Sequence, residues 1–292
     1  MILFRARAST ILYEFLATLN KNNKFLLPLN ICPIVPETFL KAGIKFEFVD
    51  ININTLCMDE SLALEAIKND NTIGGVLFVK TYGIELKSEI FFNKIKNYNS
   101  NIVIIDDQCP SIQNFNFNID ISSASLTLFS SGYSKYVDIG YGGFGFLKDS
   151  EFKGIFQDDS KSQDFLEYQI DVENKILLMK KHKEKLNAIY KKGIPINFHL
   201  GDAFNNWRFS ILINNKDKLL EEISKEEGLF ASSHFRAIDS EFTDNPVQSS
   251  NAHIISSRIV NLFNDFRFTE KQAIKTVEII NKFINKQKFF IF

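Results

Sequence analysis

Residues 129–146 read Phe129-Ser130-Ser131-Gly132-Tyr133-Ser134-Lys135-Tyr136-Val137-Asp138-Ile139-Gly140-Tyr141-Gly142-Gly143-Phe144-Gly145-Phe146. A single lysine, Lys135, lies in a loop of serines and glycines between two apolar runs. This alternation predicts two strands joined by the loop. Lys135 is either a surface residue of a hairpin or a reactive amine, and the stretch alone leaves both interpretations open.

A second informative stretch is the apolar run 102–105, which ends in Asp106 and Asp107. Such a continuous run is typical of a parallel strand that is buried on both faces. Ligands of α/β sheets bind at the carboxyl ends of the strands. The two aspartates therefore either cap the turn that follows or belong to a binding site.

The segment Ala8-Ser9-Thr10 opens a predicted helix, because apolar residues recur at helical spacing between Ile11 and Leu19. Hydroxyl residues at a helix start most often cap the first turn. They can also help to bind an anion, because the free backbone N–H groups of the first turn point in one direction. Ser9 and Thr10 are candidates for either role.

The following segments alternate between strands and helices. A strand at 25–28, a helix at 33–42 that Gly43 ends, and a strand at 45–49 form a βαβ unit, which predicts parallel pairing. Further helices are expected at 60–68, 87–98, 165–192, 216–227 and 270–285, and further strands at 74–79, 207–214 and 257–262.

These patterns predict an α/β fold, with a mainly parallel sheet flanked by helices and a small α+β C-terminal domain. We expect the large domain to span residues 1–165. Residues 166–292 then form a linking helix and the small domain. The helix at 165–192 has too few apolar residues to be buried all round, as is common for a helix that bridges domains.

In their order along the chain, these motifs resemble those of the DegT/DnrJ/StrS sugar aminotransferases, which are fold-type-I enzymes dependent on pyridoxal 5′-phosphate (PLP). In that family a serine lies five positions before the Schiff-base lysine and a Gly-Gly pair follows it, as Ser130, Lys135 and Gly142-Gly143 do here. Phe48-Val49-Asp50 matches a further family segment. The resemblance covers residues 5–148 and, more weakly, the C-terminal third.

The resemblance implies a role for each candidate residue. Lys135 would form the Schiff base with PLP, and Asp107 would face the pyridine nitrogen of the cofactor. The cofactor phosphate would be held by three hydroxyl residues, Ser9, Thr10 and Ser130. No metal ion is implied.

The chain departs from the family pattern at several positions. Ala8 replaces the glycine that opens the phosphate-binding helix, and residues 30–35 offer no aromatic residue or histidine to stack on the PLP ring. Gln108-Cys109-Pro110 follows Asp107, where the family commonly has two small residues and then His or Gln. The family's longer leader and its Gly-Tyr-Asn-x-Arg motif, which reaches a neighbouring subunit, have no match. We therefore expect a shortened member with an open site or a different acceptor.

Composition narrows the classes of partner. The 292 residues carry a formal net charge of −1 and their lysines are dispersed, so a nucleic-acid binder is not expected. Cys32, Cys57 and Cys109 are too few and too irregularly spaced for a disulfide framework or a zinc site, and they suit a reducing cytoplasm. No apolar run approaches the roughly 18 residues that span a bilayer, and no signal peptide is recognisable, so no membrane partner is expected.

The function that the resemblance implies is transfer of an amino group from an amino acid, expected to be glutamate, to a keto-sugar that is linked to a nucleotide. Its partners would be these small molecules, and the expected assembly is a homodimer. A dehydratase or lyase is disfavoured, because family dehydratases carry histidine in place of Lys135. An alternative of another class stays open: a reduced relative that binds PLP or a sugar nucleotide without turnover.

Overall fold

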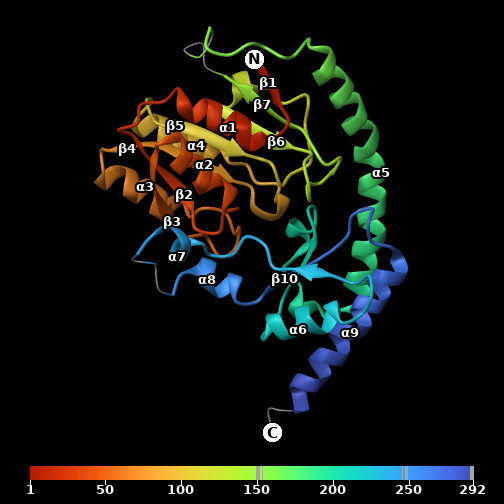
Figure 1. Ribbon diagram of the computed structural model, residues 1–292. Coiled ribbons are helices and arrows are strands. Elements are labelled where there is room, and N and C mark those ends of the chain that lie inside the picture. The colour runs from red at the N-terminus through yellow and green to blue at the C-terminus, as the bar shows by residue number, and fades with distance from the viewer. Residues whose placement is uncertain (149–151, 153, 245, 247–248, 290–292) are drawn as a thin grey trace.

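The structure is a computed structural model that describes residues 1–148, 152, 154–244, 246 and 249–289. Its centre is a seven-stranded sheet with the strand order β1-β7-β6-β5-β4-β2-β3 (Figure 1). The strands from β6 to β3 in this order pair in parallel, whereas β7 and β1 are antiparallel to their neighbours. The strands are β1 Ile2–Arg5, β2 Lys24–Pro28, β3 Lys45–Val49, β4 Ile73–Val79, β5 Val103–Asp107, β6 Leu126–Ser130 and β7 Gly143–Leu147.

Helices cover both faces of this sheet. Two helices pack on each face: α1 Ala8–Ala17 and α2 Ile34–Ala42 on one, and α3 Glu60–Asn69 and α4 Glu89–Tyr98 on the other. Successive residues of β4 alternate between the two cores, with Leu77 in the first and Phe78 in the second. Side chains of a strand alternate between its faces, so a continuous apolar run fits a strand that is covered on both sides.

The predicted βαβ unit is confirmed. The helix α2 ends at Ala42 because Gly43 takes a left-handed backbone conformation, with φ 70°. The strand β3 follows directly and pairs in parallel with β2. This arrangement places the carboxyl ends of the parallel strands at one edge of the sheet.

The long helix α5, Gln163–Gly193, runs along the side of the molecule and joins its two parts (Figure 1). Near its start, Phe165 and Tyr168 enter an aromatic core that lies against β6 and β7. Near its end, Leu186 and Tyr190 enter the core of the C-terminal unit. One helix thus contributes to two cores, as expected for a bridging helix.

The C-terminal unit is built on a three-stranded antiparallel sheet in the order β8-β10-β9. Its elements are β8 Phe209–Leu212, α6 Lys216–Ser224, β9 Ala231–Ser232, α7 Asp239–Phe242, α8 Asn251–Ser256, β10 Ile259–Leu262 and α9 Glu270–Phe289. The start of α8 is tied to the large sheet, because Asp50 accepts hydrogen bonds from the N–H groups of Asn251 (2.8 Å) and Ala252 (3.0 Å). Ala252 also packs in the core beneath α3 and α4, so the division of the chain at residue 165 stays a prediction.

The predicted fold is confirmed, and the sequence misses only short elements. The pattern does not predict β1, β9, α7 or α8. The helix α6 ends at Ser224 instead of Glu227. Elements of two to six residues are too short to show a period. In the described ranges, no helix is both long and apolar enough to cross a membrane.

Candidate active site

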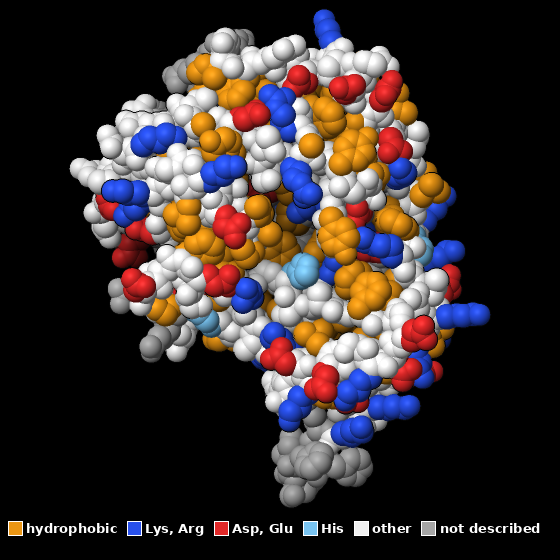
Figure 2. All heavy atoms as spheres, in the orientation of Figure 1, with side chains coloured by type: hydrophobic (Ala, Val, Ile, Leu, Met, Phe, Trp, Pro, Cys, Tyr) orange, Lys and Arg blue, Asp and Glu red, His pale blue; other side chains and the backbone are white. Residues whose placement is uncertain are grey.

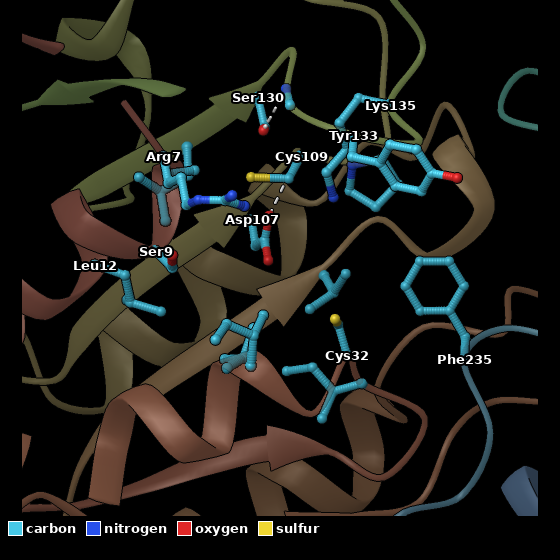
Figure 3. A pocket seen from close by; sticks show the side chains of 18 of the residues that line it. Arg7, Ser9, Leu12, Cys32, Asp107, Cys109, Ser130, Tyr133, Lys135 and Phe235 are labelled. Atoms are coloured by element: carbon cyan, nitrogen blue, oxygen red, sulfur yellow. Dashed lines mark hydrogen bonds between the residues drawn. The ribbon is translucent and has the colours of Figure 1, made fainter. Parts of the chain in front are cut away.

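A cavity of about 340 Å³ lies at the carboxyl ends of β5 and β6, with the start of α1 on one side and the loop after β6 on another (Figure 3). Parallel strands bring their carboxyl ends to one edge of the sheet, where such cavities form. Four of the five predicted site residues line it, namely Ser9, Asp107, Ser130 and Lys135.

Lys135 lies in a tight turn between β6 and β7. Its backbone N–H donates to the carbonyl of Gly132 (3.3 Å), and its side chain is half-buried in the cavity wall. Its Nζ makes no hydrogen bond or ion pair with any residue that the structure describes. The amine therefore lines the cavity with no partner, in the described part of the chain, that a ligand would have to displace.

Asp107 faces the cavity, whereas Asp106 does not. One oxygen of Asp107 accepts a hydrogen bond from the backbone N–H of Cys109 (2.9 Å), which orients the carboxylate. Asp106 instead accepts from Gln108 Nε2 (2.6 Å) and lies 3.9 Å from Lys80 Nζ. Burial raises the pKa of Asp106 to about 6. Asp107 is thus the carboxylate available to a ligand.

Cys109 lies beside Asp107 in the cavity wall (Figure 3). Burial, and then the charge of Asp107, raise the pKa of the Cys109 thiol well above its ordinary value. The thiol consequently stays protonated at neutral pH. Cys109 is therefore a neutral neighbour of the Asp107 carboxylate, and it does not compete with Asp107 for a positively charged group of a ligand.

The side of the cavity at the start of α1 is suited to an anion. The first turn of α1 lies there, and Arg7, the residue before the helix, makes no side-chain hydrogen bond to its N–H groups, although the N–H of Thr10 donates to the carbonyl of Arg7 (3.1 Å). Ser130 Oγ accepts a hydrogen bond from the N–H of Gly132 (3.2 Å), and Ser9 lies opposite. Arg7, just before the helix, points its guanidinium into the cavity (Figure 3). The sequence pattern did not single out Arg7, because nothing before α1 marks it as facing the site.

The Gly142-Gly143 pair has a steric explanation. A Cβ atom on Gly143 would lie 2.1 Å from the backbone nitrogen of Ala8, so only glycine lets β7 approach the start of α1 this closely. Gly142 has φ 92°, and a Cβ there would lie 2.3 Å from the ring of Tyr168. Gly143 therefore allows the close approach of α1 to the sheet, and Gly142 allows that of α5.

Thr10 is the predicted residue that does not line this first cavity. It is exposed and lines a neighbouring cavity of about 240 Å³ with Tyr13, Thr38 and Lys41. Ser9 lines both cavities, whereas Thr10 lines only this second one, because consecutive residues of a helix point about 100° apart. A contact between Thr10 and a cofactor stays a prediction.

A further cavity of about 330 Å³ opens on the other side of Lys135, toward the C-terminal unit. Trp207, His234 and Arg236 line it. Burial, and then the charge of Arg208, lower the pKa of His234 to about 4, so this imidazole is neutral at physiological pH. The sequence did not indicate these residues, because they come from segments that tertiary structure alone brings to Lys135.

Cys32, from the segment 30–35, lines both cavities, and Phe235, from the C-terminal unit, does so as well. Phe235 is thus an aromatic ring at the cavity that does not come from residues 30–35. Within the described parts of the chain, no group of three His, Cys, Asp or Glu side chains could hold a metal ion.

Comparison with known proteins shows the fold. No model of a known protein family matches the sequence, and no curated protein sequence matches it. A putative PLP-dependent aminotransferase from Bacillus cereus ATCC 10987 has a similar solved structure, with a TM-score of 0.77 at 19% identity, covering 96% of this chain and 85% of that one. The Helicobacter pylori aminotransferase PseC, of pseudoaminic acid biosynthesis, has a TM-score of 0.77 at 17% identity, with 96% and 86% covered.

A structure of an Escherichia coli GDP-4-keto-6-deoxy-D-mannose-3-dehydratase with bound hydrated PLP is also similar, with a TM-score of 0.71 at 17% identity and coverage of 95% and 87%. The fold is therefore that of the fold-type-I PLP-dependent transferases, as predicted. Because both aminotransferases and a dehydratase share it, the fold does not by itself select the reaction.

Proposed function

We propose that this chain is a PLP-dependent aminotransferase that moves an amino group from an amino acid, glutamate, to a keto-sugar linked to a nucleotide. One observation carries the proposal. The amine of Lys135, which has no hydrogen-bond partner among the described residues, and the carboxylate of Asp107 face the same cavity, which ends at the start of α1. Lysine, carboxylate and anion site are the three groups that a PLP aminotransferase requires.

The residues present fit PLP. Asp107 is a buried carboxylate that accepts a hydrogen bond from the backbone N–H of Cys109. It can accept a further hydrogen bond from a donor group of a ligand. At the opposite end, the helix N–H groups, Ser9, Ser130 and Arg7 offer donors and positive charge to a phosphate. The cavity volume of about 340 Å³ lies within the range for small-ligand sites, about 300–1,000 Å³.

When bound, PLP supplies an electron sink for the substrate carbanion. The negative charge of Asp107 would favour the protonated pyridine nitrogen. Lys135, once free of any covalent link, would carry the proton to and from the reacting carbon, because its amine is the base that faces this cavity from the loop. The presence of Lys135 also supports an aminotransferase over a dehydratase, in which the family carries histidine.

The cavity on the side of the C-terminal unit is the proposed place of the keto-sugar. Trp207 offers an aromatic surface, and His234, neutral at physiological pH, can exchange hydrogen bonds with hydroxyl groups. At the rim, Arg236 is paired with Glu241 (2.8 Å) but more than half exposed, so it can also meet a phosphate of the nucleotide. These features support a large polar acceptor.

We further propose a homodimer in the cytoplasm. Apolar side chains gather around the central hollow in Figure 2. At the Lys135 loop, Tyr133 is 72% exposed and Phe266 is 56% exposed, and the guanidinium of Arg267 lies near both rings, so the two form one exposed aromatic patch that a second copy can cover. The three cysteines are free thiols, which suits a reducing compartment.

The decisive experiment separates the half-reactions. Protein loaded with PLP is mixed with L-glutamate, and the absorbance change of the cofactor and release of 2-oxoglutarate are followed. A panel of keto-sugar nucleotides is then added to restore the starting spectrum. If protein that holds PLP on Lys135 supports neither step with a broad panel of amino donors, the proposed activity is wrong and a binding role without turnover replaces it.

A further inference from the structure

Ser134, which immediately precedes Lys135, adopts a left-handed backbone conformation with φ 64°. Residues other than glycine rarely adopt it, so the surrounding structure must hold it. All three polar groups of Ser134 have a partner. Its N–H donates to Asp138 Oδ2 (2.7 Å), its carbonyl accepts from Trp207 Nε1 (2.6 Å), and its Oγ accepts from Arg208 Nη2.

Two of these partners, Trp207 and Arg208, belong to the segment that leads into β8 of the C-terminal unit. Arg208 is itself held in place by packing. Its guanidinium lies 4.5 Å from the ring centre of Trp207 and 3.6 Å from that of Phe263, and Nη1 donates to Ser232 Oγ (2.5 Å). Burial lowers the pKa of Arg208 to about 10, so the group remains charged at neutral pH. Its hydrogen bond to Ser134 is therefore charge-assisted.

The Lys135 segment is held from two further directions. Arg267 Nη2 lies 3.0 Å from Asp138 Oδ2, the acceptor for Ser134. Lys183 Nζ, from α5, donates to the carbonyl of Trp207 (2.7 Å) and lies 5.1 Å from the ring centre of Tyr136. Ser134 and Tyr136, the two chain neighbours of Lys135, are thus held by residues of the C-terminal unit and of α5.

We propose that Arg208 is a positioning residue for Lys135. It keeps Ser134 in the left-handed conformation and so fixes the direction in which Lys135 enters the cavity, although Arg208 lines neither cavity that Lys135 lines. A shift of the C-terminal unit against the large sheet is then transmitted to the reactive amine through Ser134. This inference rests on the proposed function at one point only, namely that the group with which Lys135 reacts is PLP.

The test compares Arg208→Met, which keeps an apolar stem on the rings of Trp207 and Phe263, with Ser134→Ala, which removes one hydroxyl. The exposed Arg258 of the C-terminal unit supplies the control Arg258→Met. Both test variants should form the covalent link between PLP and Lys135 about tenfold more slowly, the loss expected for a charge-assisted hydrogen bond. Affinity for 4′-deoxypyridoxine 5′-phosphate, which lacks the aldehyde, should be unchanged, and the control should behave as wild type.

A second measurement needs no cofactor. Acetic anhydride is added to the apo protein, and acetylation of each lysine is followed by peptide mass. Acetylation of Lys135 should be severalfold faster in both test variants, because the released loop exposes the amine to solvent. If the wild type never links PLP, the proposed function fails, and this measurement still decides the role of Arg208.

The inference is overturned if Arg208→Met and Ser134→Ala link PLP at the wild-type rate. It is also overturned if their affinity for the analogue falls together with the rate, because Arg208 would then only maintain the fold or the cavity. Should Arg208→Met fail to fold, Ser134→Ala alone decides between these outcomes.

Discussion

Asp106 and Asp107 are consecutive residues of β5 whose carboxylates lie on opposite faces of the sheet. Asp106 is bound by Gln108 and lies near Lys80, whereas Asp107 lines the cavity that Lys135 also lines. Side chains of a strand alternate in this way, so the end of the strand offers one carboxylate to each side.

We therefore expect Asp107→Asn to retain PLP but to lose orders of magnitude in the rate of transamination, because the amide lacks the charge that keeps the pyridine nitrogen protonated. Single-turnover rates with glutamate measure this loss. Asp106→Asn is the matched control and should leave the rate within a few-fold of wild type. If Asp106→Asn slows the reaction and Asp107→Asn does not, the assignment to Asp107 is wrong and the role belongs to Asp106.

Lys135 is expected to carry PLP. The near-ultraviolet and visible absorbance of the linked cofactor should disappear in Lys135→Ala, and borohydride should trap the label on the peptide that contains Lys135. Lys148, which donates to the carbonyl of Ser122 and does not line the cavity, provides the control Lys148→Ala. Recovery of the reduced label on another lysine would refute the assignment.

Gly143→Ala should disturb the anion side of the cavity. The new Cβ would lie 2.1 Å from a backbone atom of Ala8, so α1 must move away from β7. We expect a loss of about 1–3 kcal/mol in the free energy of unfolding, together with weaker binding of pyridoxine 5′-phosphate. Gly132→Ala is the control for stability, because its Cβ would meet nothing closer than 3.5 Å. Urea titration and calorimetric binding measure the two effects, and unchanged phosphate binding in Gly143→Ala would contradict the steric argument.

Lys183 should make stability depend on pH. Burial lowers its pKa to about 7, from an ordinary value of roughly 10.4. The unfolded chain therefore binds this proton more readily between the two values, and the contribution of Lys183 to stability is lost as pH falls from 10 toward 7. The free energy of unfolding should rise more steeply between pH 7 and 8.5 in wild type than in Lys183→Met.

The exposed Lys181 on the same helix supplies the control, since Lys181→Met should retain the wild-type slope. An identical pH slope in wild type and Lys183→Met would show that Lys183 does not titrate in this range.

Assembly is the last expectation. Sedimentation should show a dimer, and Tyr133→Ser with Phe266→Ser should shift it toward monomer, because these exposed aromatic residues belong to the surface proposed to be covered by the second copy. Replacing Ile196 of the C-terminal unit, which is 83% exposed, by serine is the control. A wild-type monomer that still binds PLP tightly would remove the homodimer and favour a binding role without turnover.

The sequence predicted the parts of the fold and site that local pattern determines. Asp107 was visible because it ends a buried strand, and Lys135 because its loop departs from both neighbouring strands in composition. Arg7, Arg208 and His234 were not visible, since packing of distant segments places them. The sequence did not separate Ser9 from Thr10, because the rotation of the helix start is set by its contact with β7.

The pairing of β1 with β7 has a consequence for the time course of folding. The N-terminal amine of Met1 donates to the carbonyl of Leu147 (3.2 Å), a partner 146 positions away, and Leu3 pairs with Gly145. Contacts at such separation form late. During synthesis, the parallel strands β2 to β6 emerge before β7. Until β7 has emerged, the start of α1 lacks its contact with Gly143. We expect a nascent chain to form the side of the cavity that carries Asp107 first. The anion side, at the start of α1, should form only after residue 147 has left the ribosome.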